Sequence, residues 1–313
     1  MTERKVCLVG VNDVPGSTNI SMVNALLKLN CTVIPVNYRT ILATMGKKAL
    51  RDYMEYVQRK YQPDFTLFSK CNGMETQIVD MCSQFSKTWL FNMDPIQTIE
   101  RCPEVVEHAK NAHFSSCTGI DIVEWFKSLG VKNCYHIIQG TDYEVFRPVP
   151  AVDKYVTEIS FIGGKTEERD HFKSFLEKEG FKVKFYGLGY TGFQVIDGDF
   201  AKVCASSTFM LSMNTVNDVH KDYFSNRLVR YLSCGVCTLH YDNTGTLNKY
   251  FEDGKEILYF NDENHLADIL YKITLERAGK IALNGREKVL RFLTWEHVMS
   301  KILEIAKVRD LTQ

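Results

Sequence analysis

The sequence predicts an α/β protein made of two Rossmann-like domains, and three observations lead to this prediction. Short apolar segments alternate with longer segments of helical periodicity from residue 6 to residue 138, and the alternation starts again at residue 158. Strict alternation of this kind favours a mostly parallel sheet with helices on both faces, and a segment such as residues 6–9 is apolar throughout, as a strand of such a sheet should be. Between residues 142 and 155 the alternation stops in a stretch that contains prolines, which we interpret as a linker.

The first domain is assigned to residues 1–147. Its strands are predicted at residues 6–9, 32–36, 65–68, 89–92, 112–115 and 135–138, and its helices at 19–29, 41–59, 75–86, 103–111 and 120–129. The helix at 41–59 is predicted because apolar residues recur there at intervals of three and four. Gly46 is the weak point inside that helix.

The second domain, assigned to residues 156–293, repeats the alternation. Its strands are predicted at residues 158–162, 182–186, 209–212, 236–240 and 257–260, and its helices at 169–179, 200–205, 223–233, 246–251 and 263–275. The tail, 279–308, has helical periodicity with a break at 293–295. We expect the C-terminal helix, 294–313, to return to the first domain.

Composition indicates a soluble globular protein. Apolar residues make up 45% of the chain and charged residues 24%, and the formal net charge is zero. No global positive field therefore attracts nucleic acid or an anionic membrane. No apolar run reaches the roughly 18 residues of a membrane span, and the first residues lack a secretory cleavage pattern. Ten cysteines without a framework spacing favour reduced thiols and a cytoplasmic location.

The stretch from Asp222 to Phe260 contains the first candidate for a ligand site. A helix with polar groups on one face, from Asp222, Asn226 and Arg230, is expected to end at Gly235, where glycine suits a left-handed cap. A buried strand, a turn and another helix should follow. In sheets of this type ligands bind at the carboxyl ends of strands, where N–H groups at a helix start attract anions. We therefore expect a phosphate-bearing ligand here.

Several segments resemble GT-B glycosyltransferases. Three segments resemble the C-terminal domain of these enzymes: SNRLVRYLSCG at 225–235, NTGTLNKYFEDGKEILYF at 243–260 and NDENHL at 261–266. Residues 139–148, 159–169 and 281–286 resemble the segment before the interdomain linker, the first strand and loop of the nucleotide-binding domain, and a closing helix. The nearest similarity is to spore-coat maturation glycosyltransferases, which are allied to retaining family four. The resemblance implies two domains that face each other across a cleft and a nucleotide-diphosphate sugar as donor, with no metal or other cofactor.

The resemblance also implies a set of residues for the donor. Arg227 would face the cleft and stabilise the departing diphosphate, together with Lys165 or Arg169 and the N–H groups of residues 245–247. The resemblance and the strand ends together give these donor-binding candidates: Gly163, Gly164, Lys165, Arg169, Gly187, Asn214, Asn226, Arg230, Gly245, Thr246, Leu247 and Glu256.

Structural alternatives exist for these residues. Arg227 would otherwise be an exposed helix residue paired with a nearby carboxylate, and Lys165 and Arg169 would belong to a solvated first turn. Gly187 follows a strand, where a turn needs glycine without any ligand. Glu256 would orient its loop rather than touch the donor, and we favour that structural role.

One departure from family four concerns the donor. These enzymes commonly carry two glutamates eight positions apart, and the matching positions here are Asp222 and Arg230. Both should lie on roughly one helix face, because eight residues make a little over two turns. The first position keeps a carboxylate, but the second has the opposite charge. Arg230 would then bind phosphate or lie on the surface.

The acceptor is expected on the first domain. Asn12 and Asp13 follow its first strand, and Asp94 ends a later one. Either aspartate could act as a general base if the reaction inverts configuration, whereas a retaining reaction needs no such base. Asp94 precedes a proline, so turn formation is its structural alternative. Together with Asp222 and Arg227, Asp13 and Asp94 are the candidate catalytic residues.

Metal binding is not predicted. Asp197-Gly198-Asp199 has the form of the DxD metal signature, but it precedes a predicted helix, where aspartate is a good N-cap. Cys234 and Cys237 form a single CxxC without a second pair, so we assign them to packing.

The sequence thus predicts a metal-independent glycosyltransferase that moves a hexosyl or pentosyl group to an acceptor hydroxyl. The acceptor is a glycan, a small molecule, a protein or a modified nucleic acid. One alternative is a phage-type transferase acting on modified DNA, for which the cations at 39, 47, 48, 51, 59 and 60 would supply a basic surface. Those cations also fit the solvated face of a helix. The other alternative is a degenerate GT-B module that binds without catalysis, which Arg230 in place of a carboxylate keeps open.

Overall fold

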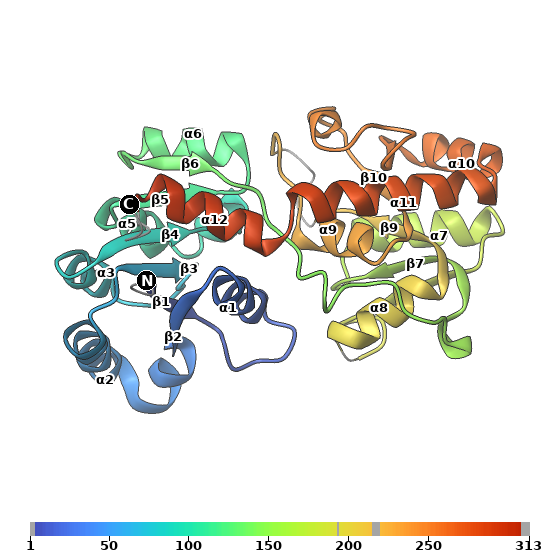
Figure 1. Cartoon of the computed structure of the whole chain (residues 1–313). Helices are drawn as coiled ribbons and strands as arrows, with labels where there is room; N and C mark the ends of the chain where they lie inside the picture. Colours follow the sequence, from blue (N-terminus) through green and yellow to red (C-terminus); the bar gives the residue numbers. More distant parts are fainter. Residues whose placement is uncertain (1–3, 193, 215–219, 308–313) are drawn as a thin grey trace. The chain divides into compact units, whose positions relative to one another are not determined.

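The computed structural model describes residues 4–192, 194–214 and 220–307. The chain forms two compact units (Figure 1). The first comprises Met1–Gln139 and Trp295–Gln313, and the second comprises Gly140–Thr294. The boundary at residue 147, expected from the prolines, stays a prediction. Each unit is described by itself below.

A parallel six-stranded sheet forms the centre of the first unit, with the order β2-β1-β3-β4-β5-β6. Its strands are β1 (Arg4–Gly10), β2 (Cys31–Asn37), β3 (Phe65–Ser69), β4 (Lys87–Phe91), β5 (Phe114–Cys117) and β6 (Cys134–His136). The central strands are buried because both of their faces are covered, as in Val6 to Val9 of β1, which are fully buried. Strand order changes direction at β1, which lies between β2 and β3.

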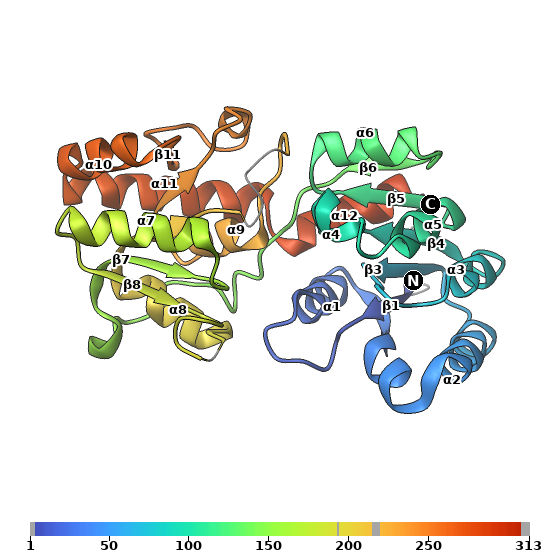
Figure 2. The same cartoon turned by 180° about the vertical axis from the view of Figure 1, so that it is seen from behind.

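Helices cover both faces of this sheet. They are α1 (Thr18–Lys28), α2 (Tyr38–Tyr61), α3 (Thr76–Ser83), α4 (Ile96–Ile99), α5 (Glu104–Asn111), α6 (Ile120–Ser128) and α12 (Trp295–Ile305). The C-terminal helix α12 returns to the first unit, as predicted, and packs with α1 on side chains of β1, β3 and β4. Trp295, only 1% exposed, meets Phe91 edge to face at 6.1 Å. Figure 1 shows α12 in front of these strands, and Figure 2 shows it behind them.

Gly46 interrupts α2, where the sequence indicated a weak point. Its φ of 84° and ψ of 177° are not helical, so α2 is two helical segments joined at a kink. The short helix α4 was not predicted, because four residues are too few to show a helical period.

A parallel five-stranded sheet forms the second unit, in the order β11-β10-β9-β7-β8. Its strands are β7 (Thr157–Ile162), β8 (Val183–Tyr186), β9 (Ser207–Ser212), β10 (Cys237–Tyr241) and β11 (Leu258–Phe260). Its helices are α7 (Glu167–Lys178), α8 (Asp197–Ala205), α9 (Asn226–Ser233), α10 (Glu263–Lys272) and α11 (Leu275–Phe292), with 3₁₀ turns η1 (Asp153–Tyr155) and η2 (Leu247–Lys249).

Two apolar clusters lie on opposite faces of this second sheet. Side chains of α7, α10 and α11 pack on one face, and side chains of α8 and α9 pack on the other (Figures 1 and 2). Phe146 and Tyr155, from the proline-containing stretch, belong to the cluster with α8 and α9. The two predicted Rossmann-like domains are therefore confirmed.

Two predicted helices differ in the structure. The helix expected at 223–233 begins at Asn226, and Asp222 precedes it with a left-handed φ of 60°. The helix expected at 246–251 is the single 3₁₀ turn η2, over Leu247–Lys249. Both differences lie beside the predicted ligand site, so they change its chemistry.

Candidate functional site

Two arginines meet at the carboxyl ends of β7 and β9 in the second unit. Arg227, from the first turn of α9, donates through Nη1 to the carbonyl of Ile162 at 3.1 Å and through Nη2 to the carbonyl of Met213. Arg169, from the first turn of α7, donates to the carbonyl of Gly164 at 2.6 Å and to the same Met213 carbonyl at 3.4 Å. The strand ends thus hold both guanidinium groups against one another.

The same aromatic ring supports both cations. The central carbon of each guanidinium lies 4.8 Å from the ring centroid of Phe161. Arg169 is only 2% exposed, and burial together with the charge of Arg227 lowers its pKa to about 10. Among the described residues Arg169 forms no ion pair with a carboxylate, and its buried Nε has no partner. A fixed pair of like charges at the carboxyl end of a sheet favours an anionic ligand.

The predicted glycines let these elements approach closely. A Cβ on Gly163 would lie 2.5 Å from Nη1 of Arg227, and a Cβ on Gly187 would lie 2.3 Å from the carbonyl oxygen of Gly163. Gly187 also has a φ of 124°, which side-chain-bearing residues rarely adopt. Gly164 has open space around its Cβ position. Close packing inside the protein therefore requires glycine at both positions, which agrees with the structural alternative for Gly187.

Two other donor candidates have partners in the protein. The ammonium of Lys165, half exposed, lies 3.2 Å from a carboxylate oxygen of Asp170. Asn214 is 5% exposed and accepts from the N–H of Ser225 at 3.2 Å, which ties the end of β9 to the start of α9. Asn226 is the first residue of that helix.

Asp222 does not share a helix face with Arg230, because it precedes α9. Its backbone N–H donates to Oγ1 of Thr246 at 2.9 Å, and one carboxylate oxygen accepts from Lys249 at 2.5 Å. Asp222 as a whole is 5% exposed. Its Oδ1 is buried and has no hydrogen-bond partner among the described residues. The prediction that Asp222 and Arg230 line one face is therefore wrong.

Asp242 occupies the position where free N–H groups were predicted. Its Oδ1 accepts from the N–H groups of Thr244 and Gly245, each at 3.0 Å, and its Oδ2 accepts from the N–H of Leu247 at 3.3 Å. The N–H of Thr246 points to Oγ1 of Thr244 at 3.4 Å. These donors are engaged by the protein itself, so the expectation of a free helix N-terminus at this position is wrong.

Arg230 packs on an aromatic ring. Its guanidinium carbon lies 4.4 Å from the ring centroid of Phe146. Burial lowers the pKa of Arg230 to about 10, and the nearby carboxylates of Asp197 and Asp142 act in the opposite direction. The structure thus gives this arginine a packing partner that the helical spacing did not reveal.

Glu256 orients its own loop. Its Oε2 accepts from the N–H of Glu252 at 2.9 Å, and its Oε1 lies 3.7 Å from the ammonium of Lys288. The favoured structural role of Glu256 agrees with these contacts.

The aspartates of the DxD form lie in the first turn of α8. Asp197 is the first residue of that helix rather than its cap, and Asp199 pairs with Lys202 at 3.0 Å. Within the described residues, no three His, Cys, Asp or Glu side chains gather as a metal site requires. Cys234 and Cys237 are both buried free thiols, as packing residues should be.

In the first unit the candidate carboxylates also have partners. Asp13 accepts from Oγ1 of Thr40 at 2.5 Å near the end of β1. Asp94, just after β4, accepts from the ammonium of Lys70 at 2.5 Å, with side-chain exposures of 17% and 35%. Lys70 was not predicted as a site residue, because it follows β3 and lies 24 residues from Asp94 in the chain.

Three of the six cations of α2 have carboxylate partners. Lys48 pairs with Asp52 at 2.5 Å and Arg59 with Glu55 at 2.8 Å, each one turn apart. Arg51 lies 3.6 Å from Glu75. These pairs fit the solvated helix face, the alternative to a nucleic-acid surface.

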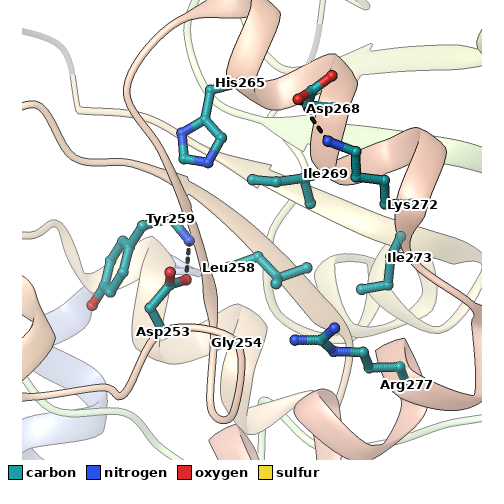
Figure 3. A pocket seen from close by; sticks show the side chains of 10 residues that line it. All are labelled: Asp253, Gly254, Leu258, Tyr259, His265, Asp268, Ile269, Lys272, Ile273 and Arg277. Atoms are coloured by element: carbon teal, nitrogen blue, oxygen red, sulfur yellow. Dashed lines mark hydrogen bonds and ion pairs between the residues drawn. The ribbon is translucent and has the colours of Figure 1, made fainter.

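A pocket of about 310 Å³ lies elsewhere in the second unit, between β11, α10 and α11 (Figure 3). Asp268 pairs with Lys272 at 2.8 Å beside it, and Asp253 accepts from the N–H of Tyr259 at 2.9 Å. None of the individual catalytic or donor-binding candidates lines this pocket.

Comparison with solved structures identifies the fold as that of the GT-B glycosyltransferases. Sucrose-phosphate synthase from Thermosynechococcus elongatus matches with a TM-score of 0.64 at 14% identity, covering 97% of this chain and 98% of that one. Anabaena HepE, in complex with UDP-glucose, matches with a TM-score of 0.64 at 12% identity and coverages of 97% and 100%. A glycosyltransferase from Rickettsia africae matches with a TM-score of 0.63 at 11% identity, and each chain is covered to 100%.

Sequence comparison adds one finding. A family model described as glycosyl transferase-like matches residues 168–304, which include both arginines of the pair. Among curated proteins, none matches the chain in sequence. The structures above share the fold at low identity, so they carry no assignment of substrate. In the described part of the chain, no helix combines the length and apolarity that crossing a membrane requires.

Proposed function

We propose that this protein transfers a sugar from a nucleoside-diphosphate sugar to an acceptor hydroxyl, with the donor bound in the second unit. The Arg169–Arg227 pair on Phe161 carries the proposal. A diphosphate would place negative charge between two cations that otherwise repel each other at the carboxyl ends of β7 and β9. Sheets of this kind bind their ligands at that edge.

The same pair supplies the catalytic effect. When the bond between the sugar and the diphosphate breaks, negative charge grows on the leaving phosphate. Two guanidinium groups already fixed by backbone carbonyls stabilise that charge without reorganising. We propose that they do so in place of a metal ion, and that Asp222, with its buried free oxygen, lies toward the sugar.

The structural neighbours suggest which donor to test first. Anabaena HepE has been observed with UDP-glucose and with UDP and glucose. We therefore propose a uridine diphosphate hexose as donor, and spore-coat maturation-type enzymes as the nearest functional relatives. All ten cysteines are free thiols and all but Cys102 are buried, which favours a reducing compartment such as the cytoplasm.

Thermal unfolding of the full chain with EDTA present tests donor binding. UDP and UDP-glucose should raise Tm, since a ligand at 100 times its Kd stabilises the folded state by about 2.7 kcal/mol. Uridine should have little effect, because it lacks the diphosphate. If no nucleoside diphosphate or nucleotide sugar raises Tm, the proposed function is wrong.

Release of UDP from UDP-glucose then separates a transferase from a module that binds without catalysis. A transferase should release UDP slowly to water and faster when an acceptor is added. Tight binding without any release, over a panel of sugar and DNA acceptors, would support the binding module.

A further inference from the structure

The backbone after β3 adopts a rarely populated conformation. Lys70 and Cys71 have φ values of 63° and 61°, and neither is a glycine. The N–H of Cys71 donates to the carbonyl of Ser69 at 2.9 Å, which closes a three-residue turn around Lys70. A γ-turn with a positive φ at its centre is rare and strained. Strain of this kind persists only where the surroundings enforce it, and it gathers at ligand sites.

Contacts on both sides hold this turn. The N–H of Lys70 donates to the carbonyl of Phe91 in β4 at 3.1 Å. The fully buried thiol of Cys71 lies 3.4 Å from the carbonyl of Val9 in β1. The turn is thus fixed to both neighbouring strands, and it directs the Lys70 ammonium to Oδ1 of Asp94 at 2.5 Å.

Asp94 is held equally firmly from the other side. Asn92 is 1% exposed, donates to the carbonyl of Asp94 at 2.9 Å and accepts from its N–H at 3.3 Å. Pro95 follows and restricts the backbone further. Both members of the ion pair are therefore placed in advance at the carboxyl edge of the sheet, as ligand-binding groups are.

Both side chains keep unused bonding capacity. Among the described residues, Asp94 is the sole partner of the Lys70 ammonium, which leaves N–H donors available. The second carboxylate oxygen of Asp94 has no described partner, and the two side chains are 35% and 17% exposed. A hydroxyl group can accept from the ammonium and donate to that oxygen at once. Because the pair is neutral overall, it suits neighbouring hydroxyls better than a phosphate.

We infer that Lys70 and Asp94 form a recognition site for the vicinal hydroxyls of an uncharged carbohydrate acceptor. The inference rests on the proposed function and names the acceptor class and a residue, Lys70, that the sequence did not indicate. The ion pair alone does not hold the turn, because a partly exposed pair stabilises a protein less than such a backbone conformation costs; the bonds to β1 and β4 enforce the turn and so fix the position of Lys70.

The test uses the full chain, UDP-glucose, and p-nitrophenyl glucosides, galactosides and mannosides as acceptor probes. Lys70→Met keeps the length of the side chain and removes its charge. It should raise the acceptor KM about tenfold or more, as loss of a charged hydrogen bond does, while the affinity for UDP stays unchanged. Lys110→Met is the matched control, because Lys110 forms an exposed pair with Glu107 at 2.8 Å and is itself 34% exposed.

Lys70→Gly separates recognition from stability. Glycine adopts a positive φ without penalty, so this variant should keep or raise Tm while it loses acceptor affinity. Asp94→Asn, which keeps the shape of the carboxylate, should lose acceptor affinity in the same way.

The outcomes separate the two proposals. The proposed site would be overturned if Lys70→Met and Asp94→Asn used acceptors with wild-type kinetics. It would also be overturned if Lys70→Gly had a lower Tm and an unchanged acceptor KM. Wild-type protein that hydrolyses UDP-glucose but uses no neutral sugar, or prefers glucose 6-phosphate to glucose, would overturn the acceptor class. Failure to bind UDP would instead refute the proposed function.

Discussion

Replacing Arg227 by alanine should remove the preference of the protein for a diphosphate. An ion pair at about 4 Å contributes about 4 kcal/mol at an effective dielectric constant of 20, and desolvation offsets part of it. A net loss of about 2–3 kcal/mol corresponds to UDP binding weakened by roughly 30- to 150-fold. Binding of uridine should change little, because the guanidinium of Arg227 contacts strand-end carbonyls and Phe161 rather than a base pocket.

Isothermal titration with UDP and with uridine, in EDTA, measures both affinities on one sample. Arg59→Ala is the matched control, since Arg59 lies on α2 and pairs with Glu55. Arg227→Lys should give an intermediate affinity, because lysine keeps the charge but loses the planar fork. Circular dichroism should show each variant folded. Equal losses for UDP and uridine would refute the reasoning, as would UDP affinity equal to wild type.

Three further predictions concern stability. Gly187→Ala should lower the free energy of unfolding by about 1–3 kcal/mol, because the backbone has a positive φ there and the new Cβ would clash with Gly163. Gly164→Ala should be nearly neutral, because the space around its Cβ position is open. Urea unfolding measures both variants, and equal midpoints would contradict the packing argument. Trp295→Ala should lower the free energy of unfolding of the first unit by about 3–5 kcal/mol, because Trp295 packs on Phe91 of β4. Amide hydrogen exchange in β4 should then become faster, and unchanged exchange there would contradict the docking of α12. Burial lowers the pKa of His240 to about 4, so the unfolded chain takes up a proton below pH 6.5 before the folded one does. Stability should therefore fall by up to about 3 kcal/mol between pH 6.5 and 4, and His240→Asn should flatten that profile in urea unfolding measured at several pH values; an unchanged profile would contradict the burial of His240.

The sheets were predictable because their strands are short, largely buried and regularly separated by segments of helical periodicity. Val6 to Val9 are apolar and fully buried, and Phe65 to Phe68 are buried as well, including the polar Thr66. Helix ends were harder to predict. The periodicity of α9 runs back to Asp222, but a left-handed φ there and the extended backbone of Ser225 delay the helix start to Asn226.

The site was predictable only in part. Arg227 and Arg169 follow strand ends, where α/β sheets place ligand-binding groups, and the structure does bring them together. The capping role of Asp242 had a local signal, since aspartate before a turn commonly accepts from the N–H groups that follow it. Lys70 had none, because a strained backbone and a partner on another strand depend on tertiary structure.

A crystal structure of the full chain with UDP tests the central claim most directly. We predict that the phosphate oxygens lie within hydrogen-bonding distance of the guanidinium groups of both Arg169 and Arg227, beside the ends of β7 and β9. A diphosphate bound elsewhere, such as in the pocket between β11 and α10, would contradict the account.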